Sequence, residues 1–226
     1  MASGAAEQNG DSTIWTPEQT KDWNQGLLNL AELIATDRIS KAARGAFSEY
    51  KPGEAFAYKS TDPMTLGLMV SRATGMPLSH WIQEQVLNPM GAAHPGLYSQ
   101  DRAKNGLGDS GMRLRMEDWM RFAVWVKESS KKSDCFGDFV KAAMAKQIGN
   151  DRNPAARKHG RMFGGYGYLI WTENTTAPGT AWATGWGGQR IGWNYGNDQM
   201  VVVFSSREAW IPEVYELARD WGKARN

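Results

Sequence analysis

The sequence predicts an α+β protein: a helical region over residues 1–160, then a three-stranded antiparallel meander and a C-terminal helix over 161–226. Two observations predict this order. Apolar residues recur at helical spacing in the first region, whereas the second changes to period two and to β-forming residues. Helices that precede an antiparallel sheet in the chain are typical of α+β folds. We expect a single domain over 1–226, because 226 residues suffice for one hydrophobic core.

Four helices are expected in the first region. Residues 17–36 begin with a capping box at Thr16 and place Trp23, Leu27 and Ile34 on one face. A helix over 63–74 carries Leu66, Met69, Val70 and Ala73 on one face and ends at Gly75. The other two are indicated by apolar residues at helical spacing: Leu78, Trp81, Ile82 and Val86, then Met116, Trp119, Met120, Ala123 and Val124. A fifth is suggested by Phe139, Val140 and Ala143.

The remaining segments are loops and strands. The glycine-rich loop 91–111 encloses Asp109 and Ser110, and it is either a functional loop or a plain connector. Residues 146–161 are polar and indicate an exposed loop. Three strands are predicted, over Tyr166–Thr172, Trp182–Tyr195 and Met200–Ser205, with a turn at 196–198 before the last one. A final helix begins at Pro212.

Composition excludes several classes of function. The net charge of +2 and scattered basic residues give no reason to expect nucleic acid, and no apolar run reaches the length of a membrane span. Cys135 is the single cysteine, so an internal disulfide is excluded. His80, His94 and His159 lack metal-ligand spacing, so we expect neither a metal nor a cofactor. No signal peptide is visible, and the compartment stays open.

The first motif that indicates chemistry is Lys51-Pro-Gly-Glu-Ala-Phe-Ala-Tyr58-Lys-Ser60-Thr-Asp-Pro63. Its Pro-Gly pair predicts a turn, its apolar run delivers Tyr58 to a fixed place, and Asp62 with Pro63 begins a helix. A tyrosine held directly before a helix is positioned rather than mobile. A packing tyrosine in a loop is the alternative.

This motif, the Ala-Thr-Gly that closes its helix and the later Leu87-Asn-Pro-Met-Gly91 resemble the serine β-lactamase and penicillin-binding-protein superfamily. The similar branch is the class C-like one, which includes esterases, nylon-oligomer hydrolases and D-amino-acid amidases. The resemblance implies a β-lactamase/transpeptidase-like fold and runs from about Lys51 to Ser206. It gives Tyr58 the role of the catalytic tyrosine and Ser60 the supporting position.

The second motif is Ala183-Thr-Gly-Trp-Gly-Gly-Gln189, whose glycines indicate either close approach of a ligand or a bend. The resemblance places Thr184, Gly185, Trp186 and Gly187 in the oxyanion and substrate-binding part of the site. Trp186 would donate its backbone N–H to the oxyanion. Ala183 departs from the family, which carries a cationic residue there. We therefore expect neutral esters or amides rather than carboxylate-bearing β-lactams as substrates.

The family nucleophile, the serine of Ser-x-x-Lys at a helix start, has no convincing counterpart. Ser48 and Ser129 match the pattern literally, but neither begins an apolar helix. Met1-Ala-Ser-Gly resembles an internal family segment that follows the nucleophile helix, so we expect the chain to begin inside an incomplete family domain. The family sheet has two earlier strands. We therefore expect self-association or a missing N-terminal segment, and exposed apolar residues on the helices 17–36 and 63–74.

The resemblance implies a serine hydrolase that forms an acyl-enzyme with a small-molecule ester or amide. Tyr58 would help to move the proton, as a tyrosinate if nearby cations lower its pKa. Because the nucleophile segment is expected to lie outside this chain, the chain alone is expected to be inactive. The alternative is a non-catalytic remnant, a binding module that keeps the wall of the cleft but performs no chemistry.

Overall fold

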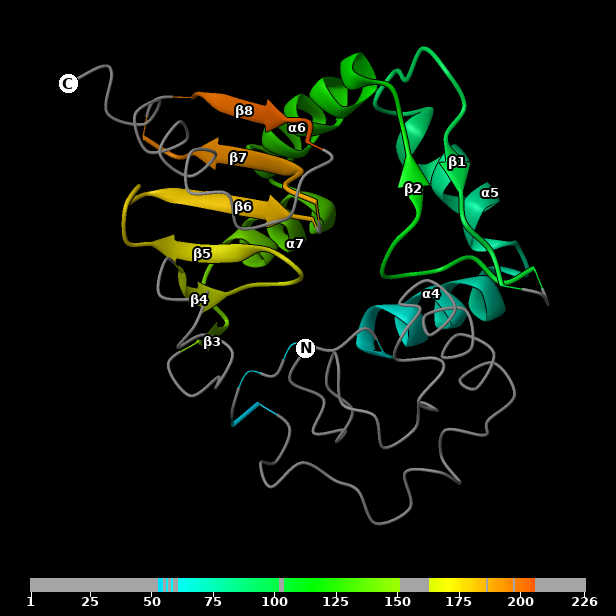
Figure 1. Ribbon diagram of the computed structural model, residues 1–226, viewed down its shortest axis with the longest axis horizontal. Coiled ribbons are helices and arrows are strands. Elements are labelled where there is room, and N and C mark those ends of the chain that lie inside the picture. Colours follow the sequence, from blue (N-terminus) through cyan, green and yellow to red (C-terminus); the bar gives the residue numbers. More distant parts are fainter. Residues whose placement is uncertain are drawn as a thin grey trace. The chain divides into compact units, whose positions relative to one another are not determined.

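The computed structural model describes residues 53–54, 56, 58, 61–101, 104–150, 163–185, 187–196 and 198–205. The chain divides into two compact units, residues 1–118 and 119–226 (Figure 1). The predicted helices over 17–36 and after Pro212 lie outside the described residues. Within the described part, no helix combines the length and the apolar character that crossing a bilayer requires.

The first unit contains helix α4 (Thr61–Thr74), helix α5 (Leu78–Ile82), the π-helical segment η1 (Gln83–Leu87) and the short strands β1 (Leu97–Tyr98) and β2 (Met112–Arg113). The predicted helix over 63–74 is confirmed, and it ends at Gly75, whose φ of 68° is one that L-residues rarely adopt. β1 and β2 pair antiparallel, with Tyr98 opposite Met112. The loop that joins them contains the glycines at 106, 108 and 111.

Helix α4 packs on a face that the apolar pattern did not indicate. Met64 and Leu68 are buried, and a Cβ on Gly67 would stand 2.8 Å from Leu78 Cδ2, so this glycine lets α5 approach closely. Leu66 and Met69 are instead 52% and 59% exposed. The expectation that the helix over 63–74 exposes apolar residues is therefore confirmed for α4.

The second unit consists of two helices and one sheet. Helix α6 (Met116–Ser130) begins in the first unit and continues into the second, and helix α7 (Cys135–Met144) follows it. Asp134 caps α7, because its side chain accepts a hydrogen bond from Gly137 N. The antiparallel sheet has six strands in chain order: β3 (Ile148–Gly149), β4 (Phe163–Tyr166), β5 (Trp171–Asn174), β6 (Thr180–Thr184), β7 (Arg190–Asn194) and β8 (Met200–Val203).

The α+β class and the antiparallel order are confirmed, but the prediction of three strands is wrong. The predicted strand 166–172 spans the turn between β4 and β5, where Gly167 N donates to Ile170 O and Leu169 has a φ of 63°. The predicted strand 182–195 likewise contains the turn between β6 and β7. Strand β3 lies in the stretch 146–161, which was expected to be an exposed loop. The alternating residue pattern continues through these tight turns, so the pattern alone did not separate the two strands on either side of each turn.

Helices α6 and α7 cover one face of the sheet. Their core cluster consists of Ala123, Val140, Met144, Ala181, Ile191 and Trp193. Trp193 is 2% exposed, and its indole N–H donates to Ala123 O at 2.9 Å, which satisfies the polar atom of this large ring. On β6, Ala181 therefore faces the helices, and Trp182 packs with Phe163 in a second cluster.

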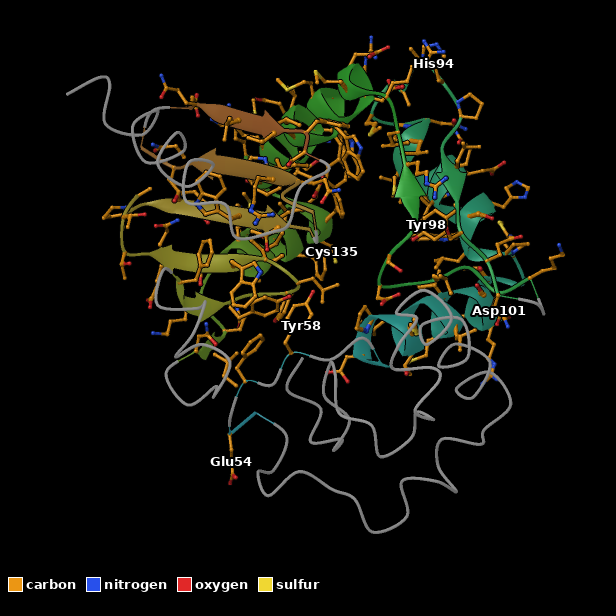
Figure 2. All side chains as sticks on the ribbon, in the orientation of Figure 1. Glu54, Tyr58, His94, Tyr98, Asp101 and Cys135 are labelled. Atoms are coloured by element: carbon orange, nitrogen blue, oxygen red, sulfur yellow. The ribbon has the colours of Figure 1, made fainter. Side chains whose placement is uncertain are left out.

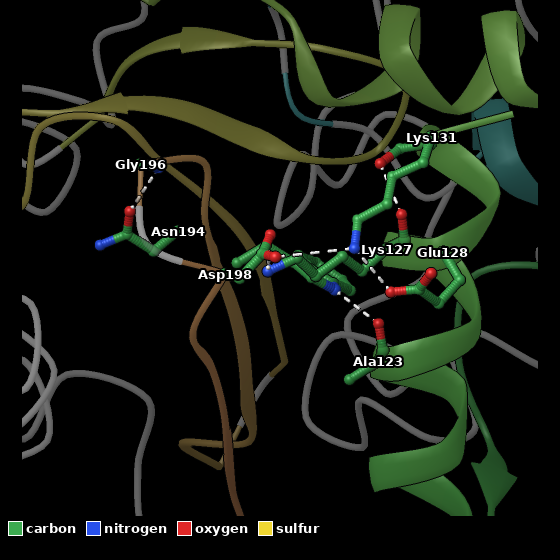
Figure 3. A network of polar contacts seen from close by, with 9 residues as sticks. Ala123, Lys127, Glu128, Lys131, Asn194, Gly196 and Asp198 are labelled. Atoms are coloured by element: carbon green, nitrogen blue, oxygen red, sulfur yellow. Dashed lines mark hydrogen bonds and ion pairs between the residues drawn. The ribbon is translucent and has the colours of Figure 1, made fainter.

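A network of charged side chains ties α6 to the β7–β8 turn (Figure 3). The largely buried Lys127 contacts Asp198 Oδ1 at 2.8 Å, and Lys131 contacts Asp198 Oδ2 at 3.6 Å and Glu128 at 2.8 Å. Asp198 has a φ of 61°, which fits the turn predicted at 196–198. Bonding to Lys127 is the main cause that holds the pKa of Asp198 below its ordinary value.

Candidate active site

The tyrosine motif lies directly before α4, as the sequence predicts. Phe56 is 3% exposed and its ring stands edge-on to Tyr58, with the two centroids 6.5 Å apart. A buried phenylalanine two residues away therefore anchors the segment that carries Tyr58, which Figure 2 labels. Tyr58 itself is 38% exposed. Ser60 lies outside the described residues, so its supporting role stays a prediction.

The loop 106–111 is fixed against the first turn of α4. Its two ends are held by hydrogen bonds from Leu107 N to Ser99 O and from Ser99 N to Gly111 O. A Cβ on Gly108 would stand 2.1 Å from Pro63 O, so only glycine allows the backbones to meet there. Gly108 thus places the following residue, Asp109, beside the helix start that Tyr58 precedes.

Asp109 and the tyrosines form one electrostatic group. Ser110 Oγ donates to Asp109 Oδ1 at 3.0 Å. Although Tyr58 is partly exposed, desolvation is the larger cause that raises its pKa, and the Asp109 carboxylate raises it further. The same two causes raise the pKa of Tyr98 to about 12. The direction for Tyr58 is opposite to the lowered pKa that a catalytic tyrosinate requires, so the phenol is the form that the described groups favour.

The second motif forms the end of β6 and a tight turn. Thr184 is the last residue of β6 and pairs with Arg190 of β7. Gly185 N donates to Gln189 O at 2.9 Å, and Gly188 N donates to Gly185 O at 3.2 Å. Gly187 and Gly188 have φ values of 91° and 92°. Of the two alternatives for these glycines, the described backbone therefore shows the bend. Trp186 lies outside the described residues, and its oxyanion role stays a prediction.

Arg190 is a residue of this turn that the sequence did not single out. Its side chain is buried, and Nη1 donates to Gly185 O at 2.8 Å and to Gln189 O at 2.6 Å. The guanidinium therefore holds the two carbonyls on either side of the turn. An arginine inside the strand predicted over 182–195 was the available signal, since a charge that becomes buried in a sheet needs local partners.

Ala183 lies among apolar groups. It is partly buried, pairs with Ile191 and packs against the core cluster under α6 and α7. A long cationic side chain at this position has to pass that cluster before it reaches solvent. The absence of the family's cation at this position is therefore compatible with the packing of the strand.

Of the two serines in the literal Ser-x-x-Lys matches, Ser129 is among the described residues and Ser48 is not. Ser129 is 1% exposed near the end of α6, so its hydroxyl is not open to a substrate. Ser48 lies outside the described residues. Among the described residues, no group of three or more His, Cys, Asp and Glu side chains could hold a metal ion. Asp118 is fully buried and serves the backbone instead, since its Oδ1 accepts from Ala93 N at 2.8 Å.

The two motifs belong to different units. Tyr58 is part of the first unit, whereas Thr184, Gly185 and Gly187 are part of the second. Within the first unit the charge of Asp109 acts on Tyr58 and Tyr98, and within the second unit Thr184 pairs with Arg190. A common cleft for Tyr58 and Trp186 stays a prediction.

Comparison with known proteins gives the family. The model of the family described as Beta-lactamase matches residues 1–225, and the chain therefore belongs to the Beta-lactamase family. An Escherichia coli (strain K12) protein described as "Putative D-alanyl-D-alanine carboxypeptidase" is 39% identical over 46 residues, which are 20% of this chain and 11% of that protein.

Solved structures share the fold. The octameric penicillin-binding protein homologue from Pyrococcus abyssi matches with a TM-score of 0.64 and 19% identity, over 97% of this chain and 52% of that one. The beta-lactamase/D-alanine carboxypeptidase from Yersinia pestis matches with a TM-score of 0.61 and 15% identity, over 97% of this chain and 68% of that one. The chain thus spans about half the length of the Pyrococcus protein. The resemblance to the serine β-lactamase and penicillin-binding-protein superfamily is confirmed, and so is its fold.

Proposed function

We propose that this chain carries the tyrosine wall and the oxyanion wall of a serine hydrolase site that acts on an ester or an amide through an acyl-enzyme. The observation that carries the proposal is the fixed position of Tyr58. It is anchored by Phe56 and precedes a helix whose first turn is in contact with Gly108, inside a chain that the Beta-lactamase family model matches over 1–225. The carboxypeptidase description of the E. coli relative supports an amide or a related acyl substrate.

Tyr58 acts in this proposal as a neutral phenol. Its raised pKa keeps the proton on the hydroxyl at neutral pH, so it can donate a hydrogen bond or a proton to the leaving group. Thr184 and the turn after it supply the oxyanion wall in this proposal, where the Trp186 N–H would bind the oxyanion. The buried Arg190 keeps this wall in shape through the carbonyls of Gly185 and Gln189.

The nucleophile in this proposal comes from a segment other than the two literal Ser-x-x-Lys matches. The burial of Ser129 supports this assignment, since an attacking serine must reach the substrate carbonyl. The 226-residue chain alone is therefore proposed to be inactive. The second candidate function is a binding module without chemistry. The burial of Ser129 and the hydrogen-bonded turn around Gly185 support it.

A fluorophosphonate probe separates the two candidates. Labelling is measured for the 226-residue chain, for its Ser129→Ala variant and for the chain extended by the coding sequence that precedes residue 1. We expect no labelling of the first two proteins and labelling of the extended one, which Tyr58→Phe slows by at least tenfold. An extended protein that carries Ser-x-x-Lys and still takes no label favours the binding module. Labelling of the chain that Ser129→Ala abolishes contradicts the assignment of the nucleophile.

A further inference from the structure

The outer surface of helix α7 has no part in the proposed site. Val140 and Met144 point inward and belong to the core cluster against the sheet. Because successive residues of an α-helix are about 100° apart, Cys135 and Ala142 lie along the middle of the opposite face. Cys135 is exposed and Ala142 is half-buried. Both side chains are small, so they leave room for another helix to approach this face closely.

One edge of this outer face is aromatic. Phe139 stacks on Tyr168 of the β4–β5 turn, with ring centroids 5.6 Å apart. Leu169 follows in the same turn, and Phe136 precedes Phe139 by one turn of α7. All four side chains are between 41% and 53% exposed. They leave on the order of 350 Å² of apolar surface open to solvent, which is enough to serve as a contact surface.

The other edge of the face carries one anion and one cation. Asp138 and Lys141 are one turn apart and form an ion pair of 3.1 Å, and both side chains are exposed. Lys141 Nζ also donates to Lys132 O at 3.0 Å, which fixes the end of its side chain. A partner with a single sign of charge would therefore be repelled by one of the two groups. The partner needs both signs of charge, in the matching order.

A second copy of α7 meets this requirement when it runs antiparallel. In a two-fold pair centred between Phe139 and Val140, residue 138 of each copy lies opposite residue 141 of the other. Asp138 then faces Lys141 twice, and the two aromatic edges meet on the other side of the pair. We propose that the chain forms a two-fold symmetric dimer through the outer faces of α7, with Asp138 of one copy paired with Lys141 of the other.

The size of the face sets the strength expected of this dimer. A stable interface buries about 800 Å² on each partner, which is more than the aromatic edge supplies without its polar surroundings. We therefore expect a reversible dimer with a Kd in the micromolar range rather than an obligate one. The inference is independent of the proposed function, since no residue of this face belongs to the Tyr58 motif or the Thr184 motif.

The test is sedimentation velocity of the 226-residue chain over a wide range of concentrations. Asp138→Lys and Lys141→Asp are measured separately and as an equimolar mixture. Each variant alone should dimerise at least tenfold more weakly, because like charges then face each other across the two-fold axis. In the mixture, positions 138 and 141 of the two variants face each other with opposite charges, so the dimer should return.

Two matched comparisons accompany these variants. Glu173→Lys removes another exposed carboxylate of the second unit, one that is also held by an ion pair, to Lys146 at 2.7 Å. This variant should dimerise like the unsubstituted chain. Phe139→Ala should weaken the dimer at least tenfold, whereas Leu66→Ala, at a similarly exposed position of α4, should leave it unchanged.

Each outcome decides the proposal. A chain that stays monomeric over the whole range overturns the second copy as the occupant and leaves a different partner for this face. A mixture that dimerises as weakly as its components shows that positions 138 and 141 do not face each other, and it overturns the pairing. Equal weakening by Glu173→Lys shows a general charge effect and also overturns it.

Return of the dimer in the mixture supports the proposal and shows that both charged variants fold. If either of them does not fold, the comparison of Phe139→Ala with Leu66→Ala decides, and equal dimerisation of these two variants overturns the proposal. Assemblies that none of the substitutions on α7 weakens indicate another surface, and they overturn the assignment to this face.

Discussion

The Tyr58 motif and the Thr184 motif, the two proposed walls of the site, are each held in place within their own unit by different means. Around Tyr58, backbone lies directly on backbone, because Gly108 leaves no room for a side chain between the loop 106–111 and Pro63. Around Thr184, the register of β6 with β7 and the buried Arg190 fix the turn through hydrogen bonds. The first wall depends on the missing side chain of Gly108, and the second depends on the guanidinium donor of Arg190. The two walls should therefore fail under different substitutions.

The largest effect is expected for Gly108→Ala. The new Cβ would stand 2.1 Å from Pro63 O, which is backbone and cannot rotate away, so we expect a loss of about 3 kcal/mol in the free energy of unfolding. Urea denaturation measures it. Gly164→Ala is the control, because its Cβ would meet the flexible end of Glu173 at 3.1 Å and should cost far less. Equal losses in the two variants would show that close backbone contact does not define the tyrosine wall.

Arg190→Met tests the other wall. The substitution keeps much of the apolar stem but leaves the carbonyls of Gly185 and Gln189 without this donor, which should cost about 2 kcal/mol. Hydrogen exchange at the Gly185 and Gly188 amides, which hold the turn, should accelerate. The loop at Gly108 should keep its exchange rates, since the donor acts on the second wall. Unchanged exchange at both glycine amides contradicts the role given to Arg190.

Ala183→Lys asks whether the second wall accepts the cation of the family pattern. Because Ala183 packs against the core cluster, the lysine stem has to displace apolar neighbours, and we expect a loss of about 1 to 2 kcal/mol. Thermal unfolding measures it, with the exposed Gln189→Lys as a control of equal charge at the same turn. A neutral or stabilising result would mean that the strand end has room for a cation, and it would weaken the substrate argument drawn from Ala183.

The smallest effect concerns the turn that Lys127 holds. Because the folded-state pKa of Asp198 is lowered, its stabilisation is present above the unfolded-state value, near 3.8, and is lost as pH falls through the folded value. The urea midpoints of wild type and Asp198→Asn should therefore differ at pH 6 and converge below that pKa. The urea midpoint of the double variant that combines Asp198→Asn with Lys127→Met should show no further dependence on pH over this range. A difference that persists at the lowest pH contradicts the ion pair as its cause.

Local signals predicted the first wall better than the second. The helix signals at Pro63 and Gly75 predicted α4, which spans Thr61–Thr74, because helix starts and stops are short-range features. The position of Tyr58 directly before this helix was predicted from the same signals. The strands around Thr184 were misjudged, because the turn at Gly187 and Gly188 looks like glycine inside a strand until the pairing is known. The cluster of Asp109 with Tyr58 was out of reach, since it depends on a contact between residues 63 and 108 that no local pattern encodes.

The contact between Gly108 and Pro63 also determines which parts of this loop can be replaced by other sequences. The segment 106–111 and the start of α4 behave as one block, so a graft that includes Gly108 but alters the helix start would lose the position of Asp109. Exchanges confined to the exposed bend at Lys104 leave that block untouched, because the bond from Leu107 N to Ser99 O isolates it. Loop libraries built on this chain can therefore vary the bend freely and keep the acidic tip in register with the tyrosines.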